Sequence, residues 1–285
     1  WSIGMPGLLF FLFHGMPRNA LIAAGLVLSA LFVFSGLDRV RSMSTTERVW
    51  TDAIEKLPDD PRSVGRWFPY LNRGHDYLEG GLDRLAVKDF TMSSRLGDGG
   101  FGLYNIGALL YSNGQYAQSL SVLDQAAAQG YYLASLEYQR GITLLALKDY
   151  TQARDAFTRA LEKKPEKSER LEILTMRARA ELELGETNQA RQDLNKVLRQ
   201  MPDHKKALVS MGILHVKTGQ NQLAHDLFSA MLLKDSHGSL FQGRAMANYG
   251  LKRKAAALAD IDRAIELAPM ESGYREWREK ILSMP

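Results

Sequence analysis

Two histidines and one glycine-rich segment are the residues whose types and spacing come nearest to a metal or phosphate site. His215 and His225 lie ten residues apart and could share a metal ion, but no nearby carboxylate completes a ligand set. Residues 98–102, Asp-Gly-Gly-Phe-Gly, contain no lysine and follow no strand pattern, so they lack what a phosphate-binding loop needs. We therefore predict hydrogen-bonded core histidines and an ordinary loop between helices.

Acidic side chains two residues apart offer no catalytic pair. Glu181 and Glu183, like Asp260 and Asp262, face different sides of a helix at that spacing, and we interpret all four as solvated charges. The sequence has no cysteine, which excludes thiolate nucleophiles and thiolate metal ligands. It also contains no zinc-protease, serine-hydrolase or P-loop motif. We predict no catalytic residue, no metal ligand and no cofactor in this chain.

The charge balance argues against nucleic acid as a partner. The chain has 36 Lys and Arg against 32 Asp and Glu, and the net charge of +4 is dispersed along the sequence. Its 45% of hydrophobic and 24% of charged residues are ordinary for a folded protein. We expect a folded chain that does not bind nucleic acid.

The elements that would position any functional side chain repeat along the sequence. Small residues recur inside helical patterns at steps of 33, 34, 37, 34 and 33 residues, at Gly74, Gly107, Gly141, Ala178, Gly212 and Ala245. A second small residue follows each of them after twelve residues, and a large apolar residue follows four further on. These large residues are Phe90, Leu123, Phe157, Leu194, Phe228 and Ile261. This register predicts one structural unit of about 34 residues, repeated six times.

Each unit has the pattern of a helix, a turn and a second helix. The small residues allow two antiparallel helices to approach closely, and the large residue fills the space between them. Pro165, Pro202 and Pro269 close three units, because proline cannot continue a helix. We predict six hairpins over residues 66–270 and a capping helix over 271–285. The 37-residue step predicts a lengthened helix or loop near residues 166–170.

This series of small, small, large apolar, small and proline positions resembles the tetratricopeptide-repeat family, and residues 135–165 match its pattern most closely. The resemblance implies an all-α fold, a right-handed superhelical solenoid of about six hairpins with a C-terminal cap. It also implies a protein or peptide partner, because stacked hairpins leave a concave groove lined by the first helix of each unit.

The repeat register projects a set of side chains into that groove. Its first half is rich in tyrosine with amide neighbours, which suits an extended or helical peptide. The predicted peptide-binding residues are Phe68, Tyr104, Asn105, Tyr111, Tyr138, Gln139, Arg179 and Tyr249. Further groove-facing candidates are Leu71, His75, Ala108, Ile142, Thr175, Val209, Ser210, Gln242 and Met246. For each tyrosine, packing between neighbouring helices is the open alternative.

The N-terminal sequence predicts a membrane anchor. Residues 20–37 carry no charge over eighteen positions, which at about 1.5 Å per residue is enough to cross a hydrocarbon core. An apolar run at 8–13 precedes them and the chain begins at Trp1, so we expect a membrane region over 1–37 whose upstream part is missing. A connecting segment with a short helix at 47–57 follows over 38–65. The lipid bilayer is then a second partner, and the oligomeric state is left open.

Two functions fit these features. The favoured one is a membrane-anchored scaffold that binds a protein partner through the groove. Residues 48–62 with the first repeat also resemble the junction in transmembrane and tetratricopeptide-containing mannosyltransferase-like proteins. That resemblance implies the alternative, a substrate-recruiting tail of a polytopic glycosyltransferase-like enzyme whose catalytic part lies upstream. It also implies a membrane of the bacterial inner type with periplasmic or lumenal repeats, whereas Arg39, Arg41 and Arg48 favour the cytoplasm.

Overall fold

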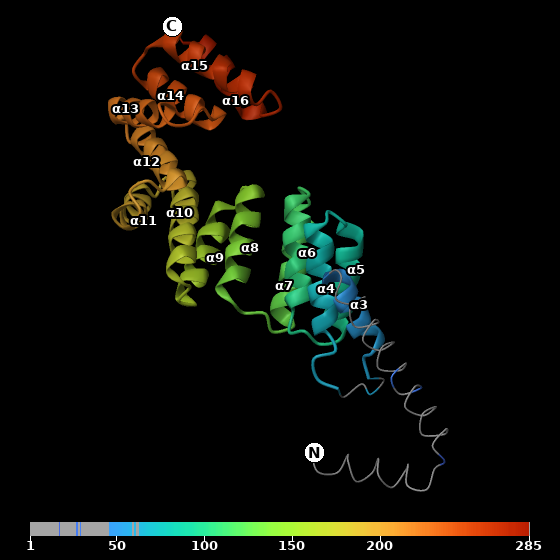
Figure 1. The fold of residues 1–285 in the computed structure, drawn as a ribbon. Helices are drawn as coiled ribbons and strands as arrows, with labels where there is room; N and C mark the ends of the chain where they lie inside the picture. Colours follow the sequence, from blue (N-terminus) through green and yellow to red (C-terminus); the bar gives the residue numbers. More distant parts are fainter. Residues whose placement is uncertain are drawn as a thin grey trace. The chain divides into compact units, whose positions relative to one another are not determined.

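The computed structural model describes residues 17, 27, 29, 46–58, 60 and 63–284. These residues form fourteen α-helices and no strand (Figure 1), which confirms the predicted all-α class. The helices are α3 (Thr46–Glu55), α4 (Phe68–Glu79), α5 (Asp83–Arg95), α6 (Phe101–Ser112), α7 (Tyr116–Ala128), α8 (Ala134–Ala146), α9 (Tyr150–Glu162), α10 (Lys167–Leu184), α11 (Thr187–Gln200), α12 (Lys205–Lys217), α13 (Asn221–Leu232), α14 (Gly238–Gly250), α15 (Lys254–Leu267) and α16 (Ser272–Leu282). They belong to two compact units, divided between Gly102 and Leu103.

The N-terminal unit holds the first predicted hairpin, α4 and α5, together with α3. Helix α3 corresponds to the short helix expected at 47–57, and it packs against α4. Trp50 of α3 meets the ring of Phe68 edge to face, with 5.9 Å between the ring centroids. Trp67, just before α4, stacks on Phe101 at 6.3 Å. The contact between Trp50 and Phe68 therefore holds α3 against the first hairpin.

The second unit is a stack of helical hairpins in chain order. From α7 to α16 each helix packs against the next one along the chain, and the succession can be followed in Figure 1. In addition α8 contacts α10, α10 contacts α12 and α12 contacts α14. The first helices of successive hairpins therefore lie side by side and form one continuous face.

The turns inside the hairpins are made by residues in the left-handed conformation. Gly114, Gly185 and Gly219 have φ angles of 74°, 78° and 75°, and each stands just after the first helix of its hairpin. Lys148 and Lys252 adopt the same left-handed conformation at the matching places. A residue of this conformation ends a helix and reverses the chain, and glycine does so without the strain that a Cβ atom adds.

Close contact of the two helices in each hairpin depends on the predicted small residues. A Cβ atom added to Gly74 would lie 2.6 Å from the ring of Phe90, and one added to Gly212 would lie 2.4 Å from the ring of Phe228. Where the small residue is alanine, the opposing residue is smaller than phenylalanine: Ala178 shares a core cluster with Leu194, and Ala245 shares one with Ile261. The sizes of the two side chains are therefore matched in these hairpins, whereas Gly107 faces the smaller Leu123, 2.7 Å from an added Cβ atom.

The second small residue and the large residue of every unit are fully buried. The small ones are Ala86, Ser119, Ala153, Ala190, Ala224 and Ala257, and the large ones are those predicted above; all have 0% exposed surface. The extra residues near 166–170 lengthen α10, which begins at Lys167 and spans 18 residues. Helix α16 lies at the predicted place of the C-terminal cap and packs on α15.

The predicted membrane span lies outside the described residues, except for Val27 and Ser29. Among the helices that the structure describes, none combines the length and the apolar character that crossing a membrane requires. The anchor therefore stays a prediction from the sequence.

Candidate functional site

The continuous face of the first helices carries a groove, which we call the first-helix groove. It has a volume of about 560 Å³ and takes side chains from α6, α8, α10, α12 and α14, together with Phe228 of α13. Its lining residues are Tyr111, Tyr138, Ile142, Met176, Arg179, Leu182, Glu183, Lys206, Val209, Ser210, Ile213, Phe228, Ser239, Gln242, Gly243 and Met246. A smaller hollow of about 280 Å³ extends it toward Lys148 and Tyr150 and shares Tyr111 and Arg179 with it.

Three of the predicted peptide-binding residues meet in this groove: Tyr111, Tyr138 and Arg179. Among the wider set of groove-facing candidates, Ile142, Val209, Ser210, Gln242 and Met246 also line it. Thr175 does not, because its side chain is buried and donates to the carbonyl oxygen of Leu171 (2.8 Å). The neighbouring Met176 lines the groove in its place.

The two tyrosines present phenol groups beside an apolar floor. Tyr138 packs against Phe157 with 6.0 Å between the ring centroids, and burial raises the pKa of Tyr138 to about 12. Its hydroxyl therefore keeps its proton at neutral pH and can donate as well as accept. Tyr111 lies 5.5 Å from the ring of Tyr116. Both tyrosines are half-buried, so part of each ring faces the groove.

One basic side chain of the groove has no acidic partner among the described residues. Lys206 forms an ion pair with Glu172, and Glu183 pairs with Lys217 at 3.3 Å. Arg179 is exposed on α10 and makes no ion pair or hydrogen bond with any described residue. The groove therefore combines apolar and phenolic surface with one guanidinium group that can bind a carboxylate.

The other predicted residues of α6 and α8 lie away from this groove. Tyr104 stacks on Tyr131 of the α7–α8 loop at 4.7 Å, and burial raises the pKa of Tyr104. Gln139 is 8% exposed, and its Nε2 atom has no hydrogen-bond partner among the described residues. Asn105 is half-buried on α6 and does not line the groove. For Tyr104 the alternative, packing between neighbouring elements, is the one observed.

The first and the last of the predicted peptide-binding residues, Phe68 and Tyr249, contact segments that flank the repeats. Phe68 belongs to the N-terminal unit, where Trp50 and Trp67 surround its ring. Tyr249 of α14 faces the capping helix, with its ring 5.9 Å from Trp277. The repeat register alone places these residues on a groove face, but their rings contact aromatic side chains of the flanking segments, and Phe68 remains 49% exposed.

A set of buried ion pairs was missed by the sequence analysis. Arg177 of α10 donates through Nε to Oδ2 of Asp193 on α11 (2.7 Å) and through a terminal nitrogen to Oγ1 of Thr158 on α9 (3.2 Å). The same arrangement joins Arg244 to Asp260 (3.0 Å) and to Ser229 (3.5 Å). Each arginine therefore connects the two helices of its hairpin to the second helix of the preceding one.

The N-terminal unit repeats this arrangement with α3. Arg73 of α4 donates to both carboxylate oxygens of Asp89 on α5 (2.7 and 3.0 Å) and to Oγ1 of Thr51 on α3 (3.1 Å). The sequence does carry a signal for all three sites, since each aspartate follows its arginine by sixteen residues. The arginine directly precedes the small residue and the aspartate directly precedes the large one.

Glu181 is buried, so the interpretation of it as a solvated charge is wrong. Its side chain lies beside Arg177 and Asp193, and burial raises the pKa of Glu181 to about 7, with the charge of Asp193 acting in the same direction. Asp260 is also buried, in its ion pair with Arg244. The two-residue spacing correctly separates the members of each acidic pair, but it cannot tell which side of the helix faces the core.

The candidates for metal and phosphate chemistry have structural roles. The Nδ1 atoms of His215 and His225 lie within hydrogen-bond distance of Gln220 and Asp226, at 2.7 and 3.1 Å. Both side chains are only partly buried, so the prediction of core histidines is wrong in that respect. Asp98 accepts hydrogen bonds from the backbone nitrogens at 100 and 102, so the glycine-rich segment is the loop that starts α6. Among the described residues, no cluster of three metal-ligating side chains occurs.

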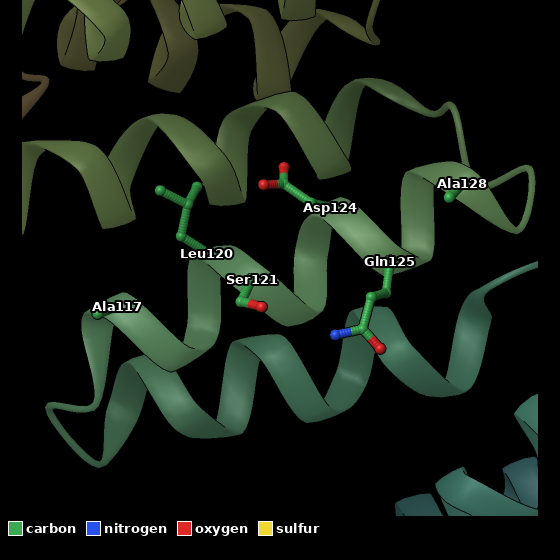
Figure 2. A pocket seen from close by; sticks show the side chains of 6 residues that line it. All are labelled: Ala117, Leu120, Ser121, Asp124, Gln125 and Ala128. Atoms are coloured by element: carbon green, nitrogen blue, oxygen red, sulfur yellow. The ribbon is translucent and has the colours of Figure 1, made fainter.

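A further depression of about 520 Å³ lies along α7 (Figure 2). Leu120 and Asp124 project from one side of this helix and Gln125 from the other. Asp124 forms an ion pair with Arg140 of α8 at 2.7 Å, and Leu120 packs against the core of the next hairpin. The side chains on that side therefore serve packing between hairpins, and this depression is not a candidate site.

Comparison with known proteins agrees with the geometry. Residues 144–204 match one family model described as tetratricopeptide repeat, and residues 104–168 and 175–238 match a second with the same description. A tetratricopeptide repeat protein from Parabacteroides merdae is similar over 88% of this chain and 96% of its own, with a TM-score of 0.60 and 17% identity. None of the curated proteins compared with the sequence matches it.

Two other solved structures share the fold. A thermophilic tetratricopeptide repeat protein of Thermus thermophilus is similar over 65% of this chain and all of its own, with a TM-score of 0.55 and 18% identity. The Cut9–Hcn1 hetero-tetramer of the APC/C is similar over 84% of this chain and 46% of the matched chain, with a TM-score of 0.63 and 14% identity. At such identities the likeness concerns the fold alone.

Proposed function

Since this chain belongs to the tetratricopeptide-repeat family, we propose that it is a scaffold that binds a peptide segment of a partner protein along its first-helix groove. The observation that carries the proposal is the groove itself, continuous over five first helices and lined by apolar, phenolic and amide side chains around Arg179. Repeat arrays offer such a face to ligands because their helices are already held in place by the neighbouring hairpins.

The size and chemistry of the groove support an extended segment with at least one carboxylate. Helices α8, α10, α12 and α14, at a spacing of about 8–10 Å, extend over about 30 Å, which an extended chain covers in about nine residues. The phenol of Tyr138 and the amide of Gln242 can hydrogen-bond to the backbone of such a segment. The guanidinium of Arg179 can bind a carboxylate through two parallel hydrogen bonds.

A second part of the proposal is that the protein is attached to a membrane. The uncharged run at residues 20–37 supports a scaffold held at a membrane, with its groove presented to partners on one side. Treating isolated membranes with alkaline carbonate tests this part. Full-length protein that is released from the membranes by this treatment contradicts a spanning anchor and leaves the groove proposal intact.

Peptide selection tests the groove directly. A library of random twelve-residue peptides is selected against the full chain, and the affinity of the enriched peptides is measured by calorimetry. We expect acidic sequences, and we expect the variant Arg179→Glu to weaken their binding at least tenfold, because it places a carboxylate opposite the carboxylate of the peptide.

A matched control separates the groove from the rest of the surface. Arg199 is an exposed arginine on α11, the second helix of the same hairpin, and Arg199→Glu makes the same change of charge there. This control should leave the affinity within twofold. Equal loss in both variants would point to overall charge, and a library that yields no binding peptide would contradict the proposed function.

A further inference from the structure

A second hollow joins the first-helix groove between α12 and α14, and we propose that it receives a large apolar side chain of the bound peptide. We call it the side hollow. Its volume is about 880 Å³, and Lys206, Val209 and Ser239 line both the side hollow and the groove. The inference rests on the proposed function, because the entering side chain belongs to the segment that lies in the groove.

The side hollow exists because one second helix carries a short side chain. Ala230 of α13 lines it, and at the same position of the repeat the other second helices carry Met92, Gln125, Arg159, Lys196 and Arg263. In α9, for example, Arg159 reaches across to Glu137 of α8 and donates to it (2.8 Å). No such bridge is possible from the methyl group of Ala230, so the surface between α12 and α13, the two helices of this hairpin, stays open at this place.

The floor of the side hollow is more apolar and more exposed than the same place in other hairpins. Met231 is half-buried and lines it, whereas the matching residues Ser93, Ala126, Ala160, Val197 and Ala264 have no exposed surface. Leu208, Leu227 and Leu240 complete the floor. Close by, Leu233 is 88% exposed at a position where three other hairpins carry Glu162, Arg199 and Glu266. Covering these apolar atoms with a ligand side chain removes them from water and is therefore favourable.

The charges around the side hollow and the groove favour an acidic occupant. Lys205 is neutralised by Asp235 at 2.8 Å, and both line the hollow. Lys234 and Asp203, which also line it, form no ion pair with a described residue and balance each other. Arg179 in the adjoining groove leaves an uncompensated positive charge. The occupant that fits is therefore a Leu, Met or Phe side chain in a peptide that also carries Asp or Glu.

A double-mutant cycle on the full chain tests the side hollow. Ala230→Met introduces the residue that α5 carries at this position, places a larger apolar side chain over the floor of the hollow without a change of charge and should leave the fold intact. Ala230→Ser is the matched control of nearly unchanged size. In each peptide enriched from the twelve-residue library, every residue is replaced by alanine in turn. The affinities of these peptides for the parent chain, Ala230→Met and Ala230→Ser are then measured.

We expect one apolar peptide residue whose replacement by alanine weakens binding to the parent chain and to Ala230→Ser at least tenfold. In Ala230→Met the same replacement should change the affinity by less than threefold, because the hollow is already occupied. Peptides that lose binding in Arg179→Glu but contain no residue coupled to Ala230 would overturn the side hollow and leave the groove proposal standing. Self-association of the parent chain that Ala230→Met abolishes would assign the hollow to a second copy instead.

Discussion

The ring of Phe157 lies so close to Gly141 that a Cβ atom on the glycine would be 2.5 Å from ring carbon Cε1. Real Cβ atoms do not approach carbon so closely, and the surrounding Ala153 and Ala160 are fully buried, so the ring has no free space to move into. The helices α8 and α9 can therefore approach this closely only because residue 141 has no side chain.

We expect Gly141→Ala to lower the free energy of unfolding by about 1–3 kcal/mol, because the added methyl group overpacks this contact. Chemical denaturation followed by circular dichroism measures the effect. Adding Phe157→Leu should recover much of the loss, since the hairpin would then have the Ala and Leu combination found at Ala178 and Leu194.

Gly273 provides the control for helix propensity. It also lies within a helix, α16, but a Cβ atom there would contact nothing within 4 Å. Gly273→Ala should therefore be neutral or stabilising by up to about 1 kcal/mol. If Gly141→Ala were as stable as Gly273→Ala, the close approach of α8 and α9 would be refuted.

Breaking a buried arginine pair should cost far more than breaking an exposed one. Arg177→Met leaves the carboxylate of Asp193, 3% exposed, without its main partner, and we expect a loss of about 2–4 kcal/mol. Arg263→Met breaks an ion pair whose members are 54% and 63% exposed, and should change the stability by less than about 1 kcal/mol. The melting temperature of each variant is compared with that of the parent chain. Equal shifts in the two variants would argue against a structural role for the buried pair.

The buried carboxyl of Glu181 predicts a stability that falls as the pH rises. Its pKa is raised from 4.5 to about 7 in the folded chain, so between these values the folded state holds a proton that the unfolded state has lost. The stabilising contribution is complete below about pH 4.5 and is lost as the pH rises through 7. Arg154, Arg177, Glu186 and Asp193 are the charged groups that act on it.

Glu181→Gln should remove this dependence. We expect the variant to equal the parent chain near pH 4.5 and to be more stable by about 2–3 kcal/mol at pH 8, where ionised Glu181 is no longer tolerated beside Asp193. In α14 the equivalent residue is already an amide, Asn248, which donates to Asp260 at 3.0 Å. Urea titrations at several pH values measure the difference, and a difference that does not change with pH would contradict a buried proton on Glu181.

Asp98 should be the most sensitive residue of the loop before α6. Its carboxylate accepts from Ser93 Oγ (2.7 Å) and from the backbone nitrogens at 100 and 102 (2.8 and 2.7 Å), and it is 3% exposed. Asp98→Ala leaves these buried donors without an acceptor and should cost about 2–3 kcal/mol. Asp149→Ala removes the partly exposed cap of α9 and should cost about 1 kcal/mol. Amide hydrogen exchange at the start of α6 should be faster in Asp98→Ala than in the parent chain, and unchanged in Asp149→Ala.

Much of the fold follows from the sequence because the repeat imposes one rule on many positions. Six small residues in a fixed register predict where helices touch, and Gly74, Gly141 and Gly212 do face phenylalanine rings. The lengthened helix α10 follows from the same register, since extra residues between fixed contacts have to extend an element. Periodicity is a property of the sequence, so these features can be read from it.

The surface was harder to predict, because it depends on what covers each position. The register places Tyr104 and Tyr249 with the groove residues, but Tyr131 and Trp277 lie on their rings. Glu181 lies on a helix face whose burial is decided by α9 and α11 as well as by its own helix. The side hollow depends on the short side chain of Ala230, and its effect appears only when the neighbouring hairpins are in place.

Helix α3 has a practical consequence for expression of the N-terminal unit. Its Thr51 accepts from Arg73 at 3.1 Å, as Thr158 accepts from Arg177, so α3 stands to the first hairpin as the second helix of one hairpin stands to the next. A recombinant boundary drawn at residue 66, where the repeat pattern begins, would remove this helix and with it the contact of Trp50 on the ring of Phe68, which is already 49% exposed. Shortened versions designed for crystallography or labelling should start ahead of Thr46.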